Sequence, residues 1–600
     1  MAKLSRRSFL SGSMIAAAGG ASLLLGACAS DGGAAKTPQS GQIAGSGSST
    51  GKGGELNVEC VLEDGKLLHI NVLKSQESAG VGTEAIDVLS GLIVDNQTLN
   101  VDAVSGATLS SRAFVLATTD ALKQAGEDAD EWKARAKAAP ALPDSIPTDV
   151  DVVVVGAGGA GYAAALTAAR NGSSVVMIEK LGITGGDTIL SGGAISVPNN
   201  YFQRRDGIED SVEKLAEDML VGGDNIGDPE LVQVIAEGAY DAMEWLTFEA
   251  DVAWQPYQQF FGGHSVARSL VPYGQEGSEI IVKLDKRCKE VDGLTIVRNM
   301  KAEELVVESG VVTGVKATHT LSGDPYTFKA KHVILATGGF GSNVEMRVKY
   351  NPKMDESILS TDSVGATGDG ISMAEAIGAN LIDMQYIQTY PTCDVETGGL
   401  LYTGNMRLNQ NAICVNKEGK RYVEELERRD VISEATTQQI DGVGYMVFTQ
   451  EQVDKTGVFN ANKSEVENLL AREKMVKGDT LEEACKPFGI DAAELQKTID
   501  TWNGYCAAGK DDDFNYRGTL NPINEGPYYV IVFKPSVHYT MGGLHINPQA
   551  QVLDDAGEPI SGLMAIGEVA GHKMGDNRLG SCSIADAFVF GRRAGEAVSK

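Results

Sequence analysis

Closely paired cysteines are missing from this chain. Its 600 residues contain eight cysteines and seven histidines, but no C-x-x-C pair and no C-x-x-C-H motif. This absence argues against c-type haem and against the usual iron–sulfur spacings. The spacings do not predict a small disulfide scaffold either, so most of these thiols should be buried as small apolar groups. The histidines are scattered singly, and the sequence therefore predicts no metal site.

Positive charge and long apolar runs are also scarce. Lys and Arg number 51 against 81 Asp and Glu, which gives a formal net charge of -30. A chain of this sign is a poor partner for nucleic acid and for anionic lipid headgroups. After residue 28 no apolar run reaches the length of a membrane span. The hydrophobic content of 42% is enough for the cores of several domains.

The N-terminal residues have the pattern of an export signal. Residues 5–10 resemble a twin-arginine motif, and the apolar run 14–27 is too short for a span but suits a signal peptide. Residues 25–28 resemble a lipobox, which makes Cys28 the expected lipidated residue; a plain signal peptide is the alternative. We therefore expect an exported lipoprotein held at the outer face of the cell membrane. Residues 29–54 are rich in Gly and Ser, which predicts a flexible linker.

Residues 102–111, Asp-Ala-Val-Ser-Gly-Ala-Thr-Leu-Ser-Ser, form a distinctive polar motif. They resemble the acceptor sequence of FMN-binding domains that carry FMN on a threonine through a phosphoester bond. The resemblance implies covalent FMN at Thr108, attached by a separate flavin transferase. A Ser/Thr-rich turn at a helix start is the alternative. Alternation over 55–73 and a helix over 111–124 predict a small α+β domain around the motif.

A nucleotide-binding signature begins shortly afterwards. Residues 151–155 are a β-branched run typical of a buried strand, followed by Gly-Ala-Gly-Gly-Ala-Gly, an Ala-rich helix and a second strand. Gly156 permits the tight turn, Gly158 lets a pyrophosphate approach, and Gly161 lets helix and strand pack closely. Glu179, at the end of the second strand, is expected to bind ribose hydroxyls. A glycine-rich turn without a nucleotide is the alternative, but the whole series in this order is a strong signal.

Further motifs favour FAD over NAD. Segments 185–193, 333–339, 367–370 and 562–568 resemble, in this order, the flavin-contacting segments of the fumarate reductase and succinate dehydrogenase flavoprotein family. The resemblance covers residues 150–600 and implies non-covalent FAD. The cofactor-binding residues expected from the fingerprint and the family are Gly156, Gly158, Gly159, Ala160, Gly161, Glu179, Lys180, Thr184, Gly185, Gly186, Asp187, Thr188, Ser191, Gly192, Gly193, Ala336, Thr337, Gly338, Asp369, Glu568 and Ser583.

The resemblance also implies the architecture. We expect an α/β fold in which a Rossmann-like FAD-binding domain carries an inserted α+β capping, or clamp, domain and follows the small α+β FMN-binding domain. The expected boundaries are signal 1–28, linker 29–54, FMN-binding domain 55–128, linker 129–149, FAD-binding domain 150–385, capping domain 386–535 and a second FAD-binding part 536–600.

Three motifs indicate the catalytic residues. Residues 419–430 resemble the family's G-x-R-F-x-x-E-x-x-x-R-D, which places Arg429 at the proton donor and leaves Arg428 as a salt-bridged neighbour. H-Y-T-M-G-G from His538 and N-R-L-G around Arg578 resemble motifs that bind substrate carboxylate. The implied reaction is reduction of a carbon–carbon double bond conjugated to a carboxylate, with hydride from reduced FAD at the β-carbon. Because arginine is normally always protonated, the donor needs a relay, which the family supplies from an arginine and a glutamate.

The chain departs from fumarate reductases at two positions. Tyr390 stands where their Q-x-H-P-T motif has histidine, and a tyrosine there resembles urocanate reductases. Thr403 and Arg407 fit family positions, but Gly404 or Asn405 stands where the relay glutamate is expected. A neutral tyrosine offers an aromatic face and one hydroxyl, so urocanate or an arylacrylate is favoured over fumarate. Proton delivery must then use another group or water.

The leading hypothesis is an exported FAD/FMN reductase of an α,β-unsaturated carboxylate that serves anaerobic respiration. Electrons would come from a membrane donor, quinol-linked or another redox protein, and pass from FMN to FAD. Fumarate reduction proper and a FAD-dependent dehydrogenase acting in the oxidative direction are the enzymatic alternatives, since steroid dehydrogenases share this fold. An electron-carrier lipoprotein with a degenerate FAD cleft is the non-enzymatic alternative.

Overall fold

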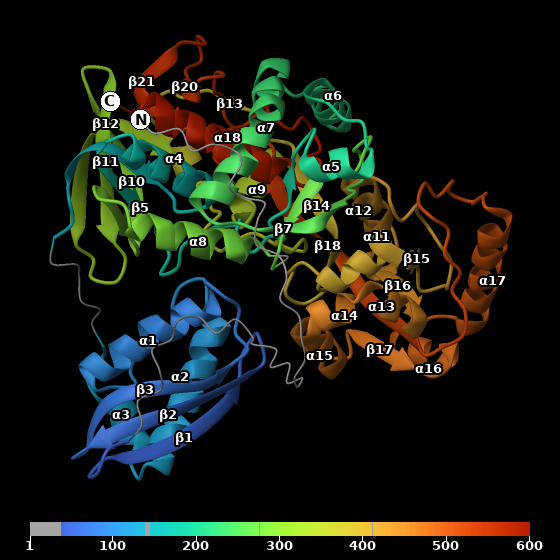
Figure 1. Ribbon diagram of the computed structural model, residues 1–600, viewed down its shortest axis with the longest axis horizontal. Helices are drawn as coiled ribbons and strands as arrows, with labels where there is room; N and C mark the ends of the chain where they lie inside the picture. Colours follow the sequence, from blue (N-terminus) through green and yellow to red (C-terminus); the bar gives the residue numbers. More distant parts are fainter. Residues whose placement is uncertain (1–37, 139–144, 275, 411, 600) are drawn as a thin grey trace, which may run out of the picture.

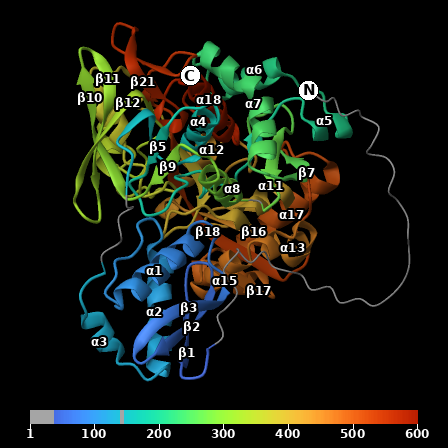
Figure 2. The same cartoon turned by 60° about the vertical axis from the view of Figure 1, so that its left-hand side comes forward.

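The computed structural model describes residues 38–138, 145–274, 276–410 and 412–599, and it has three parts (Figure 1). The FMN-binding domain (blue) lies below the FAD-binding domain, and the capping domain (orange) lies beside the FAD-binding domain (Figures 1 and 2). The expected signal at 1–28, with its lipobox Cys28, lies outside the described residues.

The FMN-binding domain is an antiparallel sheet of order β1-β2-β3 with helices packed on it. Its core contains Val58, Leu62 and Phe114, all buried. Its elements are β1 (Ile43–Thr50), β2 (Glu55–Glu63), β3 (Lys66–Ser75), α1 (Gly82–Asn96), α2 (Thr108–Gln124) and α3 (Ala129–Ala134).

The prediction of a flexible linker over 29–54 is wrong for its second half, because Ile43–Thr50 form strand β1. The glycines there serve close packing. A Cβ at Gly45 would lie 2.1 Å from the carbonyl oxygen of Ala121, and one at Gly47 would lie 2.1 Å from that of Ala117. Only a strand without these side chains can lie directly on helix α2. A composition typical of disorder therefore belongs to the core of this domain.

The linker expected at 129–149 is also partly structured. Helix α3 begins after Asp128, whose side chain accepts hydrogen bonds from the N–H groups of Asp130 and Glu131. Trp132 in this helix is fully buried. The domain therefore extends past 128, because a single aromatic side chain ties the segment to the core.

The FAD-binding domain is built on a sheet of order β10-β11-β12-β4-β5-β9, with β21 beside β12. Strands β12, β4, β5 and β9 run parallel, and the glycine-rich turn lies at the carboxyl end of β4. Helices α4 and α18 pack together over this sheet (Figure 1). The predicted strand–helix–strand unit is confirmed, so the turn lies at the sheet edge where such folds bind ligands.

The strands of this domain are β4 (Asp149–Val155), β5 (Val175–Ile178), β6 (Ile195–Ser196), β7 (Trp254–Gln259), β8 (Ser269–Pro272), β9 (Leu294–Val297), β10 (Met300–Glu308), β11 (Val311–His319), β12 (Pro325–Leu335), β13 (Leu381–Ile382), β19 (Gly543–Leu544), β20 (Gln551–Leu553) and β21 (Pro559–Ala565). Its helices are α4 (Gly159–Arg170), α5 (Tyr201–Asp206), α6 (Val212–Gly222), α7 (Pro229–Glu249), α8 (Gly277–Lys289), α9 (Val344–Tyr350), α10 (Asp369–Glu375), η4 (Gly567–Val569) and α18 (Cys582–Ala597).

The capping domain surrounds a second sheet of order β14-β18-β16-β15, with β17 also paired to β18. Strand β18 crosses the expected boundary at 535 without a break and carries His538 from the cap into the FAD-binding domain. The strands are β14 (Ile387–Cys393), β15 (Ile413–Val415), β16 (Gly444–Thr449), β17 (Met475–Gly478) and β18 (Tyr528–Thr540). The helices are η1 (Tyr402–Asn405), α11 (Met406–Gln410), α12 (Arg429–Thr437), η2 (Ile440–Gly442), α13 (Gln450–Thr456), α14 (Val458–Ala461), α15 (Lys463–Ala471), α16 (Leu481–Cys485), η3 (Lys486–Phe488) and α17 (Ala492–Ala508).

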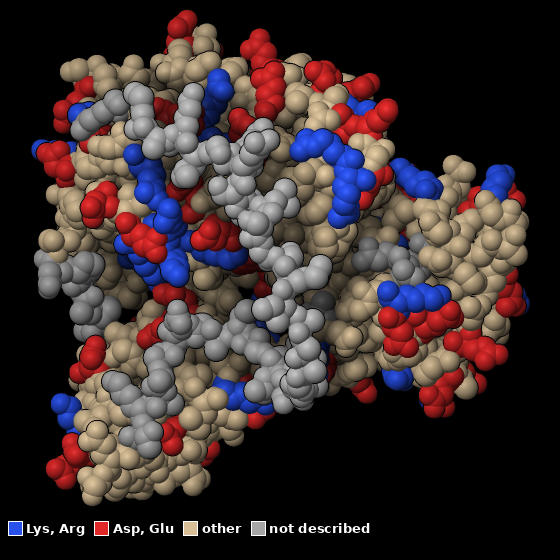
Figure 3. All heavy atoms as spheres, in the orientation of Figure 1, with Lys and Arg blue, Asp and Glu red and all other residues tan. Residues whose placement is uncertain are grey.

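The surface and the thiols follow the composition. Acidic side chains are spread over the face of the molecule shown in Figure 3. Within the described ranges, none of the helices combines the length and apolar character that a membrane crossing requires. The seven cysteines that the structure describes are all free thiols, and all but Cys506 are buried, as the spacings predict.

Candidate active site

One cavity of about 890 Å³ lies where the FAD-binding domain meets the cap. Its walls come from the turn after β4, the segment after β5, the turn after β12 and the cap segments around Tyr390 and Tyr402. A volume of this size at the carboxyl ends of parallel strands suits a large nucleotide cofactor together with a small substrate.

The glycine turn has the geometry that a pyrophosphate requires. A Cβ at Gly156 would lie 2.4 Å from the carbonyl oxygen of Ala336, and one at Gly161 would lie 2.0 Å from that of Gly156. Gly158, in contrast, has no atom nearer than 3.9 Å on its open side, and it precedes the first turn of α4 without a side-chain cap. The uncapped N–H groups of a helix start favour a phosphate. These residues fit FAD.

The acid at the end of β5 is held in place by the backbone. Glu179 accepts hydrogen bonds from the N–H groups of Ala157 at 3.0 Å and Leu181 at 2.9 Å. Lys180 donates to Asp369 at 2.7 Å and to Thr367 at 2.6 Å. All the expected FAD residues line the cavity except three. Those three are Gly161, Thr184 and Gly185.

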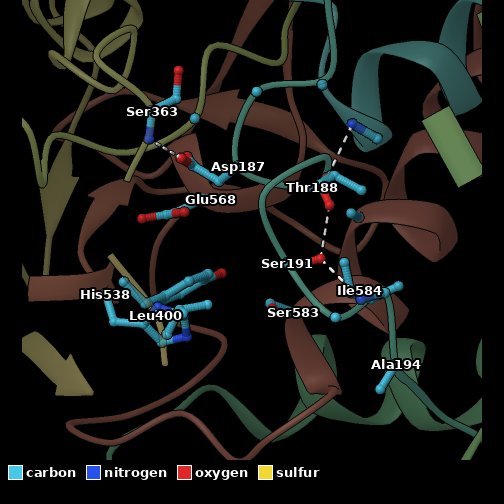
Figure 4. A pocket seen from close by; sticks show the side chains of 18 of the residues that line it. Asp187, Thr188, Ser191, Ala194, Ser363, Leu400, His538, Glu568, Ser583 and Ile584 are labelled. Carbon is cyan, nitrogen blue, oxygen red and sulfur yellow. Dashed lines mark hydrogen bonds between the residues drawn. The ribbon is translucent and has the colours of Figure 1, made fainter. Parts of the chain in front are cut away.

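The three exceptions support the cavity wall from behind. Gly161 lets α4 pack on the turn, and the Gly185 N–H donates to the carbonyl of Ala157 at 2.7 Å. The Thr184 hydroxyl lies 2.8 Å from the Tyr162 hydroxyl. In front of them, the Thr188 hydroxyl accepts a hydrogen bond from the Gly159 N–H. This bond ties the flavin-contacting segment 185–193 to the start of α4 (Figure 4).

Asp187 and Glu568 line one side of the cavity, and with Asp362, a neighbour outside the cavity lining, they form what we call the carboxyl wall. In Figure 4 Asp187 and Glu568 lie close to one another, and the Ser363 N–H donates to Asp187. Burial raises the pKa of Asp187 to about 6, with repulsion from Glu179 adding to it, and burial raises the pKa of Glu568 to about 8, with repulsion from Asp187 adding to it. Burial also raises the pKa of Asp362, and its Oδ2 has no hydrogen-bond partner among the described residues. The sequence analysis missed Asp362 because it belongs to no motif.

A guanidinium wall, made of Arg429 and Arg578 with the ring of His538, lines another part of the cavity together with Tyr390. The Arg429 guanidinium carbon lies 4.8 Å from the centre of the Tyr390 ring, and that ring lies 5.1 Å from the ring of His538. Arg578 lies over the ring of Tyr539 at 4.9 Å, and its Nε has no partner within the described ranges. The structure thus brings together four residues that are far apart in the sequence.

Burial controls the charges on this wall. Burial and, secondly, the neighbouring positive charge of Arg578 lower the pKa of Arg429 to about 9. Burial and the two arginines hold the pKa of His538 well below its usual value, so this ring is neutral. Arg429 and Arg578 are two buried cations that form no ion pair with any described carboxylate, and such a site favours an anion.

Arg428 differs from its neighbour in every respect. It donates to Asp224 at 2.6 Å and to Asp430 at 2.7 Å, and its side chain is partly exposed. The expectation that Arg428 is salt-bridged is therefore confirmed. Arg429, which begins helix α12, points into the cavity with only a long contact of 3.4 Å to Gln388.

Thr403 and Arg407 do not line the main cavity. The Thr403 hydroxyl donates at 2.6 Å to Glu465 of α15, which also accepts from the N–H groups of Tyr402 and Thr403. Glu465 was not predicted, since nothing in the sequence connects it to this turn.

Arg407 lies behind Arg429. It donates to the carbonyl of Glu425 at 2.6 Å, and its Nε has no partner among the described residues. A small cavity of about 20 Å³ lies between Arg407, Arg429 and Glu427. It has room for about one water molecule, next to the Arg429 guanidinium.

Thr108 is the first residue of α2 and is exposed. The preceding loop is fixed by Ser111, which accepts from the Val104 N–H at 3.0 Å and donates to the Ala107 carbonyl at 2.8 Å. The hydroxyl that the motif marks therefore stands at a helix N-terminus, where a phosphate is electrostatically favoured. These residues fit a phosphoester-linked FMN. Within the described chain, no cluster of three His, Cys, Asp or Glu side chains could hold a metal ion.

Two family models match the chain. The FAD binding domain matches residues 151–584, and the FMN-binding domain matches residues 51–123. The second match starts close to β1, and together the two cover most of the chain that the structure describes.

Known proteins resemble the chain over different lengths. A urocanate reductase of Eggerthella lenta is 65% identical over 600 residues, which is 99% of both chains. A cytochrome-type fumarate reductase of Shewanella frigidimarina is 38% identical over 462 residues, covering 76% of this chain and 78% of that protein. A solved open conformation of a flavocytochrome c3 fumarate reductase matches with a TM-score of 0.65 and 36% identity over 76% of this chain and 78% of that one.

Proposed function

Because the chain belongs to the fumarate reductase and succinate dehydrogenase flavoprotein family, whose members are FAD-dependent oxidoreductases acting on CH–CH groups, we propose that it reduces urocanate or a similar aryl-substituted acrylate. Bound FAD supplies hydride chemistry at the cavity, and FMN supplies electrons to it. The residues of the chain then determine which acid binds and how it is protonated.

Arg578 and His538 bind the carboxylate. The guanidinium of Arg578 can hold both oxygens in parallel hydrogen bonds, and it has an unpartnered Nε for this purpose among the described residues. His538 is neutral and stands against the Thr361 hydroxyl at 2.8 Å, which fixes the orientation of its ring. Together they withdraw electron density from the conjugated double bond and make the β-carbon electrophilic.

Arg429 protonates the α-carbon. A pKa lowered to about 9 makes its guanidinium a much better acid than an ordinary arginine, because the best donor has a pKa near the working pH. Arg407 and the water-sized cavity between Arg407 and Arg429 give a route by which a replacement proton reaches Arg429. This route takes the place of the relay glutamate that the chain lacks.

Tyr390 decides the other end of the substrate, and its position is the observation that carries the proposal. Its ring is buried between Arg429 and His538, at 4.8 Å and 5.1 Å, so it forms an aromatic surface beside the carboxylate site. A second carboxylate would meet a neutral phenol there, whereas a heteroaromatic ring can stack on it. The likeness to the urocanate reductase of Eggerthella lenta supports the same choice.

The wider setting is part of the proposal. We propose that FMN is linked to Thr108 by a flavin transferase and receives electrons from a membrane donor, quinol-linked or another redox protein, in anaerobic respiration. The signal-like residues 1–28 support export and lipid anchoring at Cys28.

An anaerobic reoxidation assay tests the substrate. Dithionite-reduced, flavin-loaded protein is mixed with urocanate, cinnamate, crotonate, methacrylate or fumarate, and the flavin absorbance is followed. We expect fast reoxidation by urocanate or cinnamate and slow reoxidation by fumarate. Fast reoxidation by fumarate alone would overturn the choice of an aromatic acid. No reoxidation by any acid would instead favour a dehydrogenase or an electron carrier.

A further inference from the structure

The FMN-binding domain touches the FAD-binding domain through a small set of charged side chains. Arg298, in the turn between β9 and β10, forms an ion pair with Glu84 in the first turn of α1. Its other terminal nitrogen lies 3.7 Å from Asp285 of α8. The three side chains are 14 to 28% exposed, so this contact is partly screened from solvent. In Figures 1 and 2, α1 is the helix of the blue domain that faces the FAD-binding domain.

The charged contact leads to the FAD-binding elements by hydrogen bonds. The Tyr162 hydroxyl of α4 lies 2.7 Å from Asp285 and 2.8 Å from Thr184, which directly precedes the flavin-contacting segment 185–193. A phenol has one hydrogen, which goes to the carboxylate, so Thr184 donates to the phenol oxygen. Glu84 of one domain is thus linked through Arg298 to the helix and loop that hold FAD in the other.

An apolar contact lies beside the charged one. A Cβ at Gly182 would come within 2.9 Å of the Val104 side chain, and one at Gly106 within 3.0 Å of Ile183. The two backbones therefore approach as closely as they do because both positions are glycine. Gly106 is two residues before Thr108, and Leu181, next to Gly182, lines the FAD cavity. The FMN acceptor loop consequently rests on the rim of that cavity.

We propose that Glu84 and Arg298 form an electrostatic latch, which docks the FMN-binding domain with Thr108 at the rim of the FAD cavity. The two domains belong to one chain, so even a modest contact has a high effective concentration in its favour. Release of the latch lets the FMN-binding domain leave the rim of the FAD cavity. The undocked domain can then meet an electron donor. The docking itself does not depend on the proposed substrate; only its consequence for electron transfer rests on FMN at Thr108.

Charge reversal at the latch tests the proposal. Glu84→Arg places a cation against Arg298, whereas Glu63→Arg makes the same charge change on the same domain at the exposed end of β2. Small-angle X-ray scattering of the full chain, with and without flavins, gives the radius of gyration. We expect a measurable increase for Glu84→Arg and none for Glu63→Arg. We also expect the wild-type protein to expand at high salt, because the ion pair keeps some exposure to solvent and salt weakens exposed ion pairs.

Electron transfer gives the second measurement. After confirmation of the covalent flavin by mass spectrometry, we expect Glu84→Arg to slow FMN-to-FAD transfer at least about tenfold. Reoxidation of the reduced FAD by substrate should keep its wild-type rate, because Glu84 lies outside the catalytic cavity. The latch would be overturned if Glu84→Arg kept the wild-type radius of gyration and the wild-type rate of FMN-to-FAD transfer. It would also be overturned if Glu63→Arg changed both quantities as much as Glu84→Arg does. If no acid reoxidises the enzyme but Glu84→Arg increases the radius of gyration as expected, only the proposed function would be overturned.

Discussion

The carboxyl wall and the guanidinium wall belong to the same cavity but respond to burial in opposite directions. Burial raises the pKa of Glu568 to about 8, which favours the neutral acid at pH 7, and that of Asp187 to about 6, which leaves it mostly ionised there. It moves Arg429 only to about 9, which leaves this group charged at pH 7. The first wall can therefore face an uncharged polyol as donor or acceptor, whereas the second requires an anion. The difference separates a cofactor half from a substrate half.

Removal of a guanidinium should have the largest effect. Arg429→Ala eliminates the proposed proton donor, and we expect kcat to fall by roughly 10²–10⁴-fold. Arg428→Ala is the matched control, since this neighbour pairs with Asp224 and Asp430 and does not line the cavity. Steady-state kinetics with a reduced viologen donor measure both. Equal losses in the two variants would show that the effect comes from the fold of α12.

Exchange of the aromatic neighbour should change selectivity by less. Tyr390→His restores the residue that fumarate reductases carry, and we expect the kcat/KM ratio of urocanate to fumarate to fall by roughly 10–200-fold. Tyr390→Phe keeps the ring and should retain the preference for urocanate. If Tyr390→Phe loses the preference as fully as the histidine variant, then the hydroxyl, not the ring, selects the substrate.

A pH profile should distinguish the two walls without mutation. In the proposed mechanism Arg429 donates in its protonated form, which is present below its pKa of about 9 and is lost above it. We therefore expect kcat/KM, which reports groups of the free enzyme, to fall about tenfold per pH unit above 9. Tryptophan fluorescence at each pH checks that the protein stays folded. A flat profile to pH 10.5 would contradict this role for Arg429.

Local motifs predicted every residue of the guanidinium wall, and Asp187 and Glu568 of the carboxyl wall, but not Asp362. The turn from Gly156, the loop at Asp187 and the position of Glu568 are each determined within a short segment, so sequence alone located them. Asp362 and Glu465 support residues near the cavity through tertiary packing, which no local pattern records. The prediction of a flexible linker over the β1 segment was wrong for the opposite reason. The composition around Gly45 and Gly47 indicates flexibility, and only the position of α2 shows that these glycines allow close packing.

The smallest expected effect is on the stability of the FAD-free protein. The pKa of Glu568 is raised in the folded state, so the folded chain binds more protons than the unfolded one between about pH 4.5 and 8. Stability contributed by the protonated form is therefore lost as pH rises through about 8. Glu568→Gln cannot ionise and should raise the melting temperature at pH 9 relative to wild type, by roughly 2–4 °C for each kcal/mol recovered, but not at pH 4. Glu558→Gln, at an exposed turn, is the control. Thermal melts that are parallel at both pH values would mean that Glu568 stays ionised without its cofactor, and the contrast between the walls would then rest on Asp187 and Asp362.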